Sequence, residues 1–377
     1  MSASATGAAG PAAGMDGPLH VIGCGIVSAV GYNAPATLAA LRAGVSGVRA
    51  SGWLDPVSGE PLPCGRVSLP QRWGGARLLA DLLAPAVWEC LQAVALHAQD
   101  PVATPLRLSD VPLFIAVGAP DRPGRPADLA AALPRLLGDS LGQPLHPASM
   151  IFESDQVGGL HALQAARQWL AGGSDRRAIV AGVDSLLERD TLESLARRRR
   201  LLTARTIDGL HAGEAGAAVL VSLSPGAGGG LALLGWGEGV EAGTIDSTVP
   251  TRGDGLTAAV RQALSAAGLR LDDVAYRVTD VSGEHYKFKE AMIVAVRLQQ
   301  GPRAVPLDLW HPIEYLGEVG AAIVPCLLAW AWHSQSQGYA PGPTALCHVS
   351  SDHGGRGALV VQAVAGARDP FQGARAA

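Results

Sequence analysis

SDQVGGLHALQAARQWLAGG, residues 154–173, is the stretch of sequence that decides the fold. Gly158-Gly159 predicts a tight turn in which the backbone can approach a neighbouring segment closely, and leucines at helical spacing predict a helix after it. We expect Gly172-Gly173 to end this helix with a left-handed cap, before a short apolar strand over 178–183. A residue at the mouth of such a helix lies where backbone amides and the helix dipole can activate a thiol or hold an anion.

Strands and helices alternate through the rest of the chain in two successive sets. The first set is predicted as strand 19–24, a helix from Gly75 to His97 broken near Pro85, strand 111–117, helix 128–137 and a weak strand at 150–152. Residues 224–230 (SPGAGGG) form the clearest linker. The second set is predicted as strand 231–235, helix 255–267, strand 275–281, helices 284–298 and 319–332, and strands 345–349 and 358–363. The like order of elements predicts two similar α/β halves, although no sequence repeat is visible.

The turn and the helix after it resemble the nucleophile segment of β-ketoacyl synthases and their thiolase-fold relatives, in which a cysteine precedes a small-residue run. Arg200-Leu201-Leu202 followed by Gly213-Glu214 and Gly216-Ala217-Ala218 resembles a second segment of that family. The resemblance implies an α/β, duplicated, five-layered (αβαβα) thiolase-like fold. On it we expect a disordered tail over 1–17, an N-terminal half over 18–224, a C-terminal half over 231–364 and a loose tail over 365–377.

The residues that the family uses for condensation are replaced on this alignment. Registering on Gly158-Gly159, Gly283 and Gly320-Ala321-Ala322 locates the family's cysteine, its two histidines and its lysine in this sequence. The degenerate positions are Gln156 for the cysteine, Ser282 and Glu284 for the first histidine and its threonine, Pro312 and Gly317 for the lysine and the second histidine, and His353 for the gating phenylalanine. Because an amide is no nucleophile, we expect no catalytic residue of the condensing reaction in this chain.

A re-cast site in the old pocket is the alternative to a simple loss of function. His285, His311 and Glu318 lie on segments that should converge there, and a Glu–His pair could act as a general base. We favour a structural explanation, in which Glu284 caps the helix that it opens and His285 packs on the first turn. The run Arg197–Arg200 is likewise predicted to be a solvated helix face rather than an anion site.

Three relatives of the synthases bear on the function. Loading synthases and chain-length factors carry glutamine in place of the cysteine, and SDQVGGLHAL resembles the chain-length factor. The strings DVSGEHYKFKEA, LWHPIEYLGEVGAA and ALCHVSSDHGGRGALVV resemble thiolase-like proteins encoded beside type VI secretion effectors. We therefore predict a catalytically inactive scaffold that serves as an accessory or adaptor protein for such an effector. The alternative is a carrier-protein-dependent decarboxylase, or a chain-length-factor-like subunit of a polyketide or fatty-acid condensing complex.

The expected partners follow from these resemblances and from the composition. We expect a homodimer, or a heterodimer with a second thiolase-like chain, with a secreted effector and, less favoured, an acyl carrier protein as further partners. The net charge of −4 gives no reason to expect nucleic acid or an anionic membrane. The five cysteines show no metal or disulfide spacing, and no role is assigned to Cys64. The expectation is a reduced, cytoplasmic protein that needs no metal or cofactor.

Overall fold

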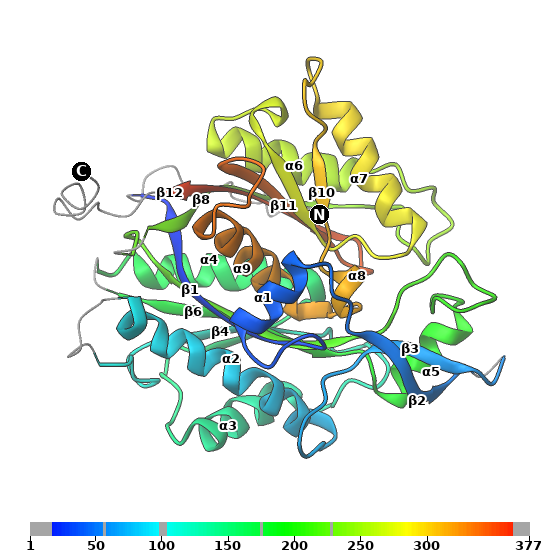
Figure 1. Cartoon of the computed structure of the whole chain (residues 1–377), viewed down its shortest axis with the longest axis horizontal. Helices are drawn as coiled ribbons and strands as arrows, with labels where there is room; N and C mark the ends of the chain where they lie inside the picture. The colour runs from blue at the N-terminus through cyan, green and yellow to red at the C-terminus, as the bar shows by residue number, and fades with distance from the viewer. Residues whose placement is uncertain (1–16, 56–57, 98–103, 174–175, 227–228, 365–377) are drawn as a thin grey trace, which may run out of the picture.

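A mixed sheet of ten strands organises the computed structural model, which describes residues 17–55, 58–97, 104–173, 176–226 and 229–364 (Figure 1). The strand order is β10-β9-β11-β12-β8-β1-β7-β6-β4-β5. The strands are β1 (Leu19–Val27), β4 (Leu113–Val117), β5 (Met150–Glu153), β6 (Ala178–Ser185), β7 (Glu214–Ser222), β8 (Gly230–Val240), β9 (Tyr276–Thr279), β10 (Asp308–Trp310), β11 (Thr344–Ser350) and β12 (Gly355–Val364).

The sheet consists of two five-stranded sets with the same internal order. β5-β4-β6-β7-β1 corresponds to β10-β9-β11-β12-β8, strand for strand. In both sets the first three strands are parallel neighbours, and the last three are antiparallel neighbours. The two sets meet where β1 and β8 pair antiparallel, with Leu19 opposite Leu233 and Val21 opposite Leu231. This topology confirms the predicted duplicated α/β fold.

Helices form three layers around the two sets of strands (Figure 1). The middle layer holds α4 (Gly158–Leu170) and α9 (Ile323–Ser336). Its packing is close, because a Cβ atom built on Gly159 would lie 2.4 Å from the Cβ of Val324. The outer layers are α2 (Gly75–His97) with α3 (Leu129–Leu141), and α6 (Asp254–Ala267) with α7 (His285–Leu298). When the two five-stranded sets are counted as two sheet layers, the order of layers is αβαβα.

Smaller elements connect the layers and shape the site. They are α1 (Ala34–Arg42), the hairpin of β2 (Val48–Leu54) and β3 (Pro61–Gly65), α5 (Arg189–Arg197), α8 (Ile313–Leu316) and the 3-10 turns η1 (Asp155–Val157), η2 (Leu271–Asp273) and η3 (Gly320–Ala322). The turns η1 and η3 lead directly into α4 and α9, and they occupy corresponding places in the two halves. Each half therefore brings a turn and a helix mouth to the centre of the molecule.

Three local predictions were wrong. Helix α2 runs through the exposed Pro85 without a break, because buried leucines on both sides of the proline pack on the same sheet. Helix α4 ends at Leu170 with Ala171 as a right-handed cap, so the predicted glycine cap is absent. The helix expected over 319–332 begins later, at Ile323, after η3. Of the predicted tails over 1–17 and 365–377, residues 1–16 and 365–377 lie outside the described residues.

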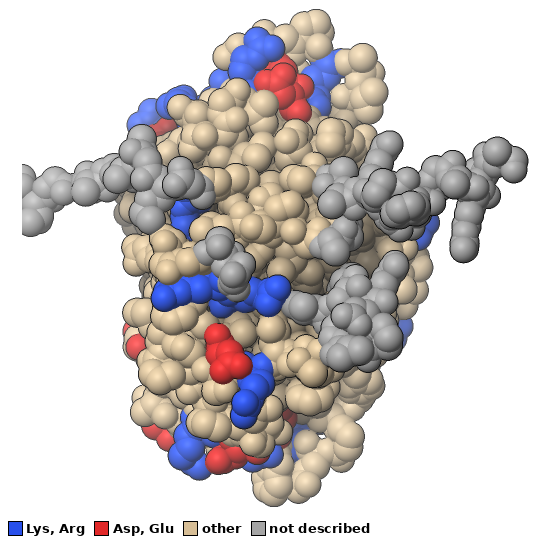
Figure 2. All heavy atoms as spheres, turned by 90° about the vertical axis from the view of Figure 1, so that its left-hand side faces the viewer, with Lys and Arg blue, Asp and Glu red and all other residues tan. Residues whose placement is uncertain are grey.

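One face of the molecule carries few charged side chains (Figure 2). Figure 2 shows a face on which uncharged residues predominate, with lysine, arginine and acidic residues in small separate groups. Within the described part of the chain, no helix combines the length and the apolar character that a bilayer crossing requires. A further set of charged side chains is buried and gathers around the pocket described next.

Candidate functional site

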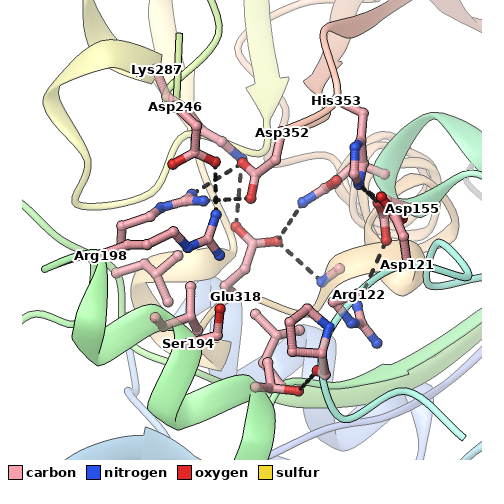
Figure 3. Close-up of a pocket in the computed structure, with 18 residues that line it drawn as sticks. Asp121, Arg122, Asp155, Ser194, Arg198, Asp246, Lys287, Glu318, Asp352 and His353 are labelled. Carbon is pink, nitrogen blue, oxygen red and sulfur yellow. Dashed lines mark hydrogen bonds and ion pairs between the residues drawn. The ribbon is translucent and has the colours of Figure 1, made fainter.

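A polar pocket opens at the mouth of α4, between the two halves of the fold. Its volume is about 290 Å³. Its walls come from the loop before α3, from η1, α5, α7 and η3, and from the loop between β11 and β12. Figure 3 shows the Glu318 carboxylate at its centre, with His353, Asp155 and Asp121 on one side and Arg198 with Asp246 on the other. Segments far apart in the sequence thus form one site.

The turn η1 presents two side chains to the pocket, Asp155 and Gln156. Asp155 has a φ of 48°, a left-handed conformation that few residues other than glycine adopt and that often marks functional positions. Its Oδ1 accepts a hydrogen bond from the backbone N–H of Ala119 at 2.7 Å, and its Oδ2 lies 3.5 Å from Nε2 of His353. The Gln156 amide donates to Oε1 of Glu318 at 3.4 Å. Asp155, with its left-handed backbone, therefore directly precedes Gln156 in this turn.

Three cations at the pocket each contact two carboxylates. Arg200 binds Glu284 at 2.6 and 2.9 Å and Asp352 at 2.5 and 3.0 Å. Lys287 binds Asp280 at 2.9 Å and lies 3.5 Å from Glu318. Arg122 likewise contacts two carboxylates, those of Asp184 and Asp155. In this set six carboxylates share three cationic side chains, so negative charge is in excess, and the fourth cation of the wall, Arg198, is paired with Asp246.

Burial and these ion pairs change the protonation of the pocket. Burial raises the pKa of Asp155 and of Glu318, and the neighbouring Arg122 and Lys287 only partly offset it. Asp352 differs, because the two-fold contact with Arg200 outweighs burial and lowers its pKa to about 2. Burial alone would lower the pKa of Lys287, but Asp280 and Glu318 hold it well above its ordinary value. The pocket thus contains two carboxyl groups that retain protons unusually well beside permanent cations.

The structure places two of the degenerate positions in the wall of this pocket, a third next to that wall, and the others outside it. Gln156 and His353 line it, and Glu284 reaches it through Arg200. The side chain of Ser282 lies beside Glu284 at 3.3 Å, whereas Pro312 caps the short helix α8 and Gly317 follows that helix. Ser282, Pro312 and Gly317 are not among the lining residues.

The suggested re-cast site is only partly assembled. Glu318 lies at the centre of the pocket, but neither His285 nor His311 lines it. His285 is exposed, and its backbone N–H donates to Asp208 at 2.7 Å. His311 packs edge-on against Phe288, with ring centroids 5.9 Å apart. The imidazole that faces the pocket belongs to His353 instead.

Sequence reasoning missed several of the charged groups in the pocket. Arg200 was predicted to lie on a solvated face, yet 5% of its side chain is exposed and it is fully ion-paired. Glu284 was expected to cap α7, but its side chain makes no capping bond and binds Arg200. Asp155, Arg122 and Lys287 were not singled out. The signal available in the sequence was Lys287, one of only two lysines in the chain and placed in the first turn of a helix.

Thiol chemistry has no support in this pocket. The five cysteines all lie in the described part of the chain, and none of them lines the pocket. Burial raises the pKa of Cys326 and of Cys347 to about 12, and it also raises that of Cys64, which packs in a small core beside Leu62. Across the described ranges, no group of three or more His, Cys, Asp or Glu side chains is arranged to hold a metal ion.

Comparison by sequence yields no relative. Protein-family models do not match the chain, and a search of curated proteins finds no match.

Comparison by structure does yield relatives of the fold. A structure of a ketosynthase in complex with its chain length factor from Xenorhabdus doucetiae contains a chain with a TM-score of 0.67 and 16% identity, covering 92% of this chain and 98% of that one. The ishigamide ketosynthase/chain length factor gives 0.68 at 16% identity, with 92% and 99% covered. A type II polyketide synthase acyl-carrier protein in complex with its ketosynthase, bound to a hexaketide, gives 0.73 at 15% identity, with 92% and 100% covered. This chain therefore has the ketosynthase fold over its described length, as the resemblance implied.

Proposed function

We propose that this chain is a non-condensing subunit with a ketosynthase fold, which acts by pairing with a second thiolase-like chain. The observation that carries the proposal is the state of the helix mouth. There the Gln156 amide is bonded to Glu318, and the surrounding wall is made of ion pairs rather than of a thiol and two imidazoles. A site built in this way lacks the nucleophile that acyl transfer requires. Two of the structural neighbours are ketosynthases solved with a chain length factor, which favours a paired role.

The edge strand β5 is the surface that we assign to this pairing. In the described sheet β5 has a strand neighbour on one side, β4, so its other edge offers backbone groups for pairing. Met150, the first residue of this strand, is 51% exposed. β5 also leads directly into η1, so a partner on this edge would lie next to the pocket.

An adaptor role for a secreted effector is the second candidate, favoured by a different surface. Along α7, the apolar residues Phe288, Met292 and Val296 recur at intervals of four residues, and all three are exposed. Side chains at this spacing form one stripe on a helix, and an exposed apolar stripe marks a site of protein interaction. The edge strand β10 belongs to the same half of the fold.

One pair of matched variants separates these two surfaces. Met150→Lys and Met292→Lys replace methionines that are 51% and 54% exposed, so both should fold normally. Tagged wild-type and variant chains would be purified from the source organism, and the co-purified proteins identified by mass spectrometry. We expect Met150→Lys to lose a second thiolase-like chain, or an untagged copy of this chain, by at least about tenfold, because a lysine blocks an edge strand. Loss of a secreted effector with Met292→Lys alone would favour the adaptor role, and retention of every partner by both variants would contradict both surfaces.

The chemistry makes a separate prediction. Incubated with malonyl and acyl thioesters of a carrier protein, the wild-type chain is expected to form no condensation product and to release no carbon dioxide. Gln156→Cys should remain inactive, because restoring a thiol does not restore the missing imidazoles. Product analysis by mass spectrometry and trapping of labelled carbon dioxide measure both steps. Carbon dioxide release by the wild-type chain that Gln156→Ala abolishes would overturn the non-condensing assignment in favour of a decarboxylase.

A further inference from the structure

The pocket has two kinds of wall. Leu186, Leu195 and Leu210 contribute apolar surface. Asp155 and Glu318 contribute carboxylates whose side chains are almost fully buried, with only 9% and 3% of their surface exposed. A volume of about 290 Å³ is close to the lower limit of small-molecule sites, roughly 300 Å³. The pocket therefore suits a small ligand with one hydrocarbon part and one polar part.

Arg122 lies closer to one of its two carboxylate partners than to the other. Its guanidinium lies 2.5 and 2.6 Å from the two carboxylate oxygens of Asp184, which stands behind the pocket wall. Asp155, which lines the pocket, is 3.7 Å from the same guanidinium. No hydrogen bond between described residues reaches Oδ2 of Asp155, whose contact is with Nε2 of His353 at 3.5 Å. The carboxylate that faces the cavity is thus the less satisfied of the two.

Lys287 also lies closer to one of its two carboxylate partners than to the other. Its ammonium group lies 2.9 Å from Asp280, which is not among the lining residues. Glu318, which does line the pocket, is 3.5 Å away. The Glu318 side chain otherwise accepts from the backbone N–H of Gly320 at 3.1 Å and from Gln156 at 3.4 Å. In both sets the carboxylate behind the pocket wall takes the short contacts with the cation. The carboxylate that lines the pocket can still accept hydrogen bonds from the cavity.

Buried carboxylates without full compensation are costly, and the cost falls when a proton or a cationic donor joins them. The raised pKa values of Asp155 and Glu318 reflect the first of these solutions. A ligand ammonium would supply the second, because its N–H groups form charge-assisted hydrogen bonds with carboxylates. An anionic ligand would add to the existing excess of negative charge and is disfavoured on the same ground.

We propose that the pocket binds a small aliphatic ammonium ion, with its N–H donors on Asp155 and Glu318 and its hydrocarbon part against Leu186, Leu195 and Leu210. The mouth of the pocket offers a path for it. His353 stands there 3.5 Å from both Asp121 and Asp155 and is 53% exposed. This ligand class differs from the acyl thioesters of condensing enzymes. The proposal does not depend on a partner at β5.

Three compounds of equal chain length test the proposal on the wild-type protein. n-Butylammonium chloride, 1-butanol and sodium butyrate would be titrated at constant ionic strength and neutral pH by isothermal calorimetry and by saturation-transfer NMR. We expect butylammonium to bind at least about tenfold more tightly than butanol, since one charge-assisted hydrogen bond accounts for a factor of that order. Equal binding of butylammonium and butanol, or preference for butyrate, would overturn the proposal.

Variants locate the binding site. Asp155→Asn and Glu318→Gln keep the shape of each side chain and remove its charge, and each should weaken butylammonium binding about tenfold or more. Asp139→Asn is the matched control, because Asp139 pairs with Arg135 on the exposed face of α3 and should bind as the wild type does. Unchanged affinity in both pocket variants would show that the ammonium binds elsewhere and would contradict the proposal. If either variant fails to fold, the comparison of three compounds on the wild-type protein still decides the question. Failure here leaves the partner assay with Met150→Lys unaffected.

Discussion

Replacing Arg356 by methionine is expected to lower the free energy of unfolding by about 3–5 kcal/mol, because it leaves the Glu290 carboxylate buried without its cation. Both side chains are 0% exposed. Nε of Arg356 lies 2.9 and 3.0 Å from the two oxygens of Glu290, and Nη1 donates to the carbonyl of Ser351 at 2.7 Å. The pair joins β12 to α7 and holds the start of the loop that carries Asp352 and His353 into the pocket.

The pH dependence of this loss has a definite sign. Burial already raises the pKa of Glu290, although Arg356 lowers it, and removal of Arg356 raises it further. A carboxyl whose pKa is higher in the folded state than in the unfolded state favours folding while it is protonated, and that contribution is lost as the pH rises through the folded pKa. The loss in free energy of unfolding caused by Arg356→Met should therefore be largest near neutral pH, and it should become smaller as the pH falls through the raised pKa of Glu290. Urea denaturation at a series of pH values measures it.

Two further variants control for unrelated effects of the substitution. Arg356→Met combined with Glu290→Gln removes the stranded charge and should recover most of the lost stability. Arg135→Met breaks an ion pair whose side chains are 69% and 59% exposed, and it should cost about 1 kcal/mol or less. A deficit of similar size in Arg356→Met and Arg135→Met would show that burial does not determine the strength of this pair.

The layers of the fold could be predicted because each rests on a local pattern. Apolar runs such as 111–117 mark strands buried on both faces, and leucine spacing marks helices such as α4. The like order of the two sets predicted the duplication that the strand order displays. Pro85 led to the wrong prediction of a helix break. The packing of α2 along its whole length outweighs the cost of one proline within the helix.

The pocket could not be predicted in the same way, because its contacts join residues far apart in the sequence. Arg200 belongs to an arginine run that is typical of a solvated helix face, and its partners Glu284 and Asp352 lie 84 and 152 positions away. The composition of the run does not show that Arg200 is buried while the side chain of Arg197 is 69% exposed. The alignment with the synthases did locate Gln156 and His353, since it rests on the turn and loop glycines beside them.

The alignment with the synthases and the chemistry of the pocket must therefore be considered separately. Alignment with the synthases selects Gln156, whose amide lines the pocket. The backbone singles out its neighbour, because Asp155 has the left-handed conformation and the carboxylate that faces the cavity. The charged pocket at the mouth of α4 can therefore have chemistry of its own on a scaffold that other proteins share.

Replacing Gly237 by alanine is expected to lower the free energy of unfolding by about 1–3 kcal/mol, because the new methyl group meets backbone that cannot move aside. A Cβ atom there would lie 2.1 Å from the carbonyl oxygen of Ala259 on α6. Gly235 and Gly239 on β8 make similarly close approaches, so three alternate glycines set the distance between this strand and its helix.

Denaturation of Gly237→Ala beside Gly52→Ala measures the effect, since Gly52 lies on β2 with no other atom within 4 Å of its added Cβ. Gly52→Ala should unfold as the wild type does. Amide hydrogen exchange should quicken first along α6 and much less along α4, because the clash lies in the outer layer of the second half. Equal stability of the two variants would mean that α6 can shift away from β8 without cost. The close approach would then be a consequence of small residues rather than a requirement of the five-layered packing.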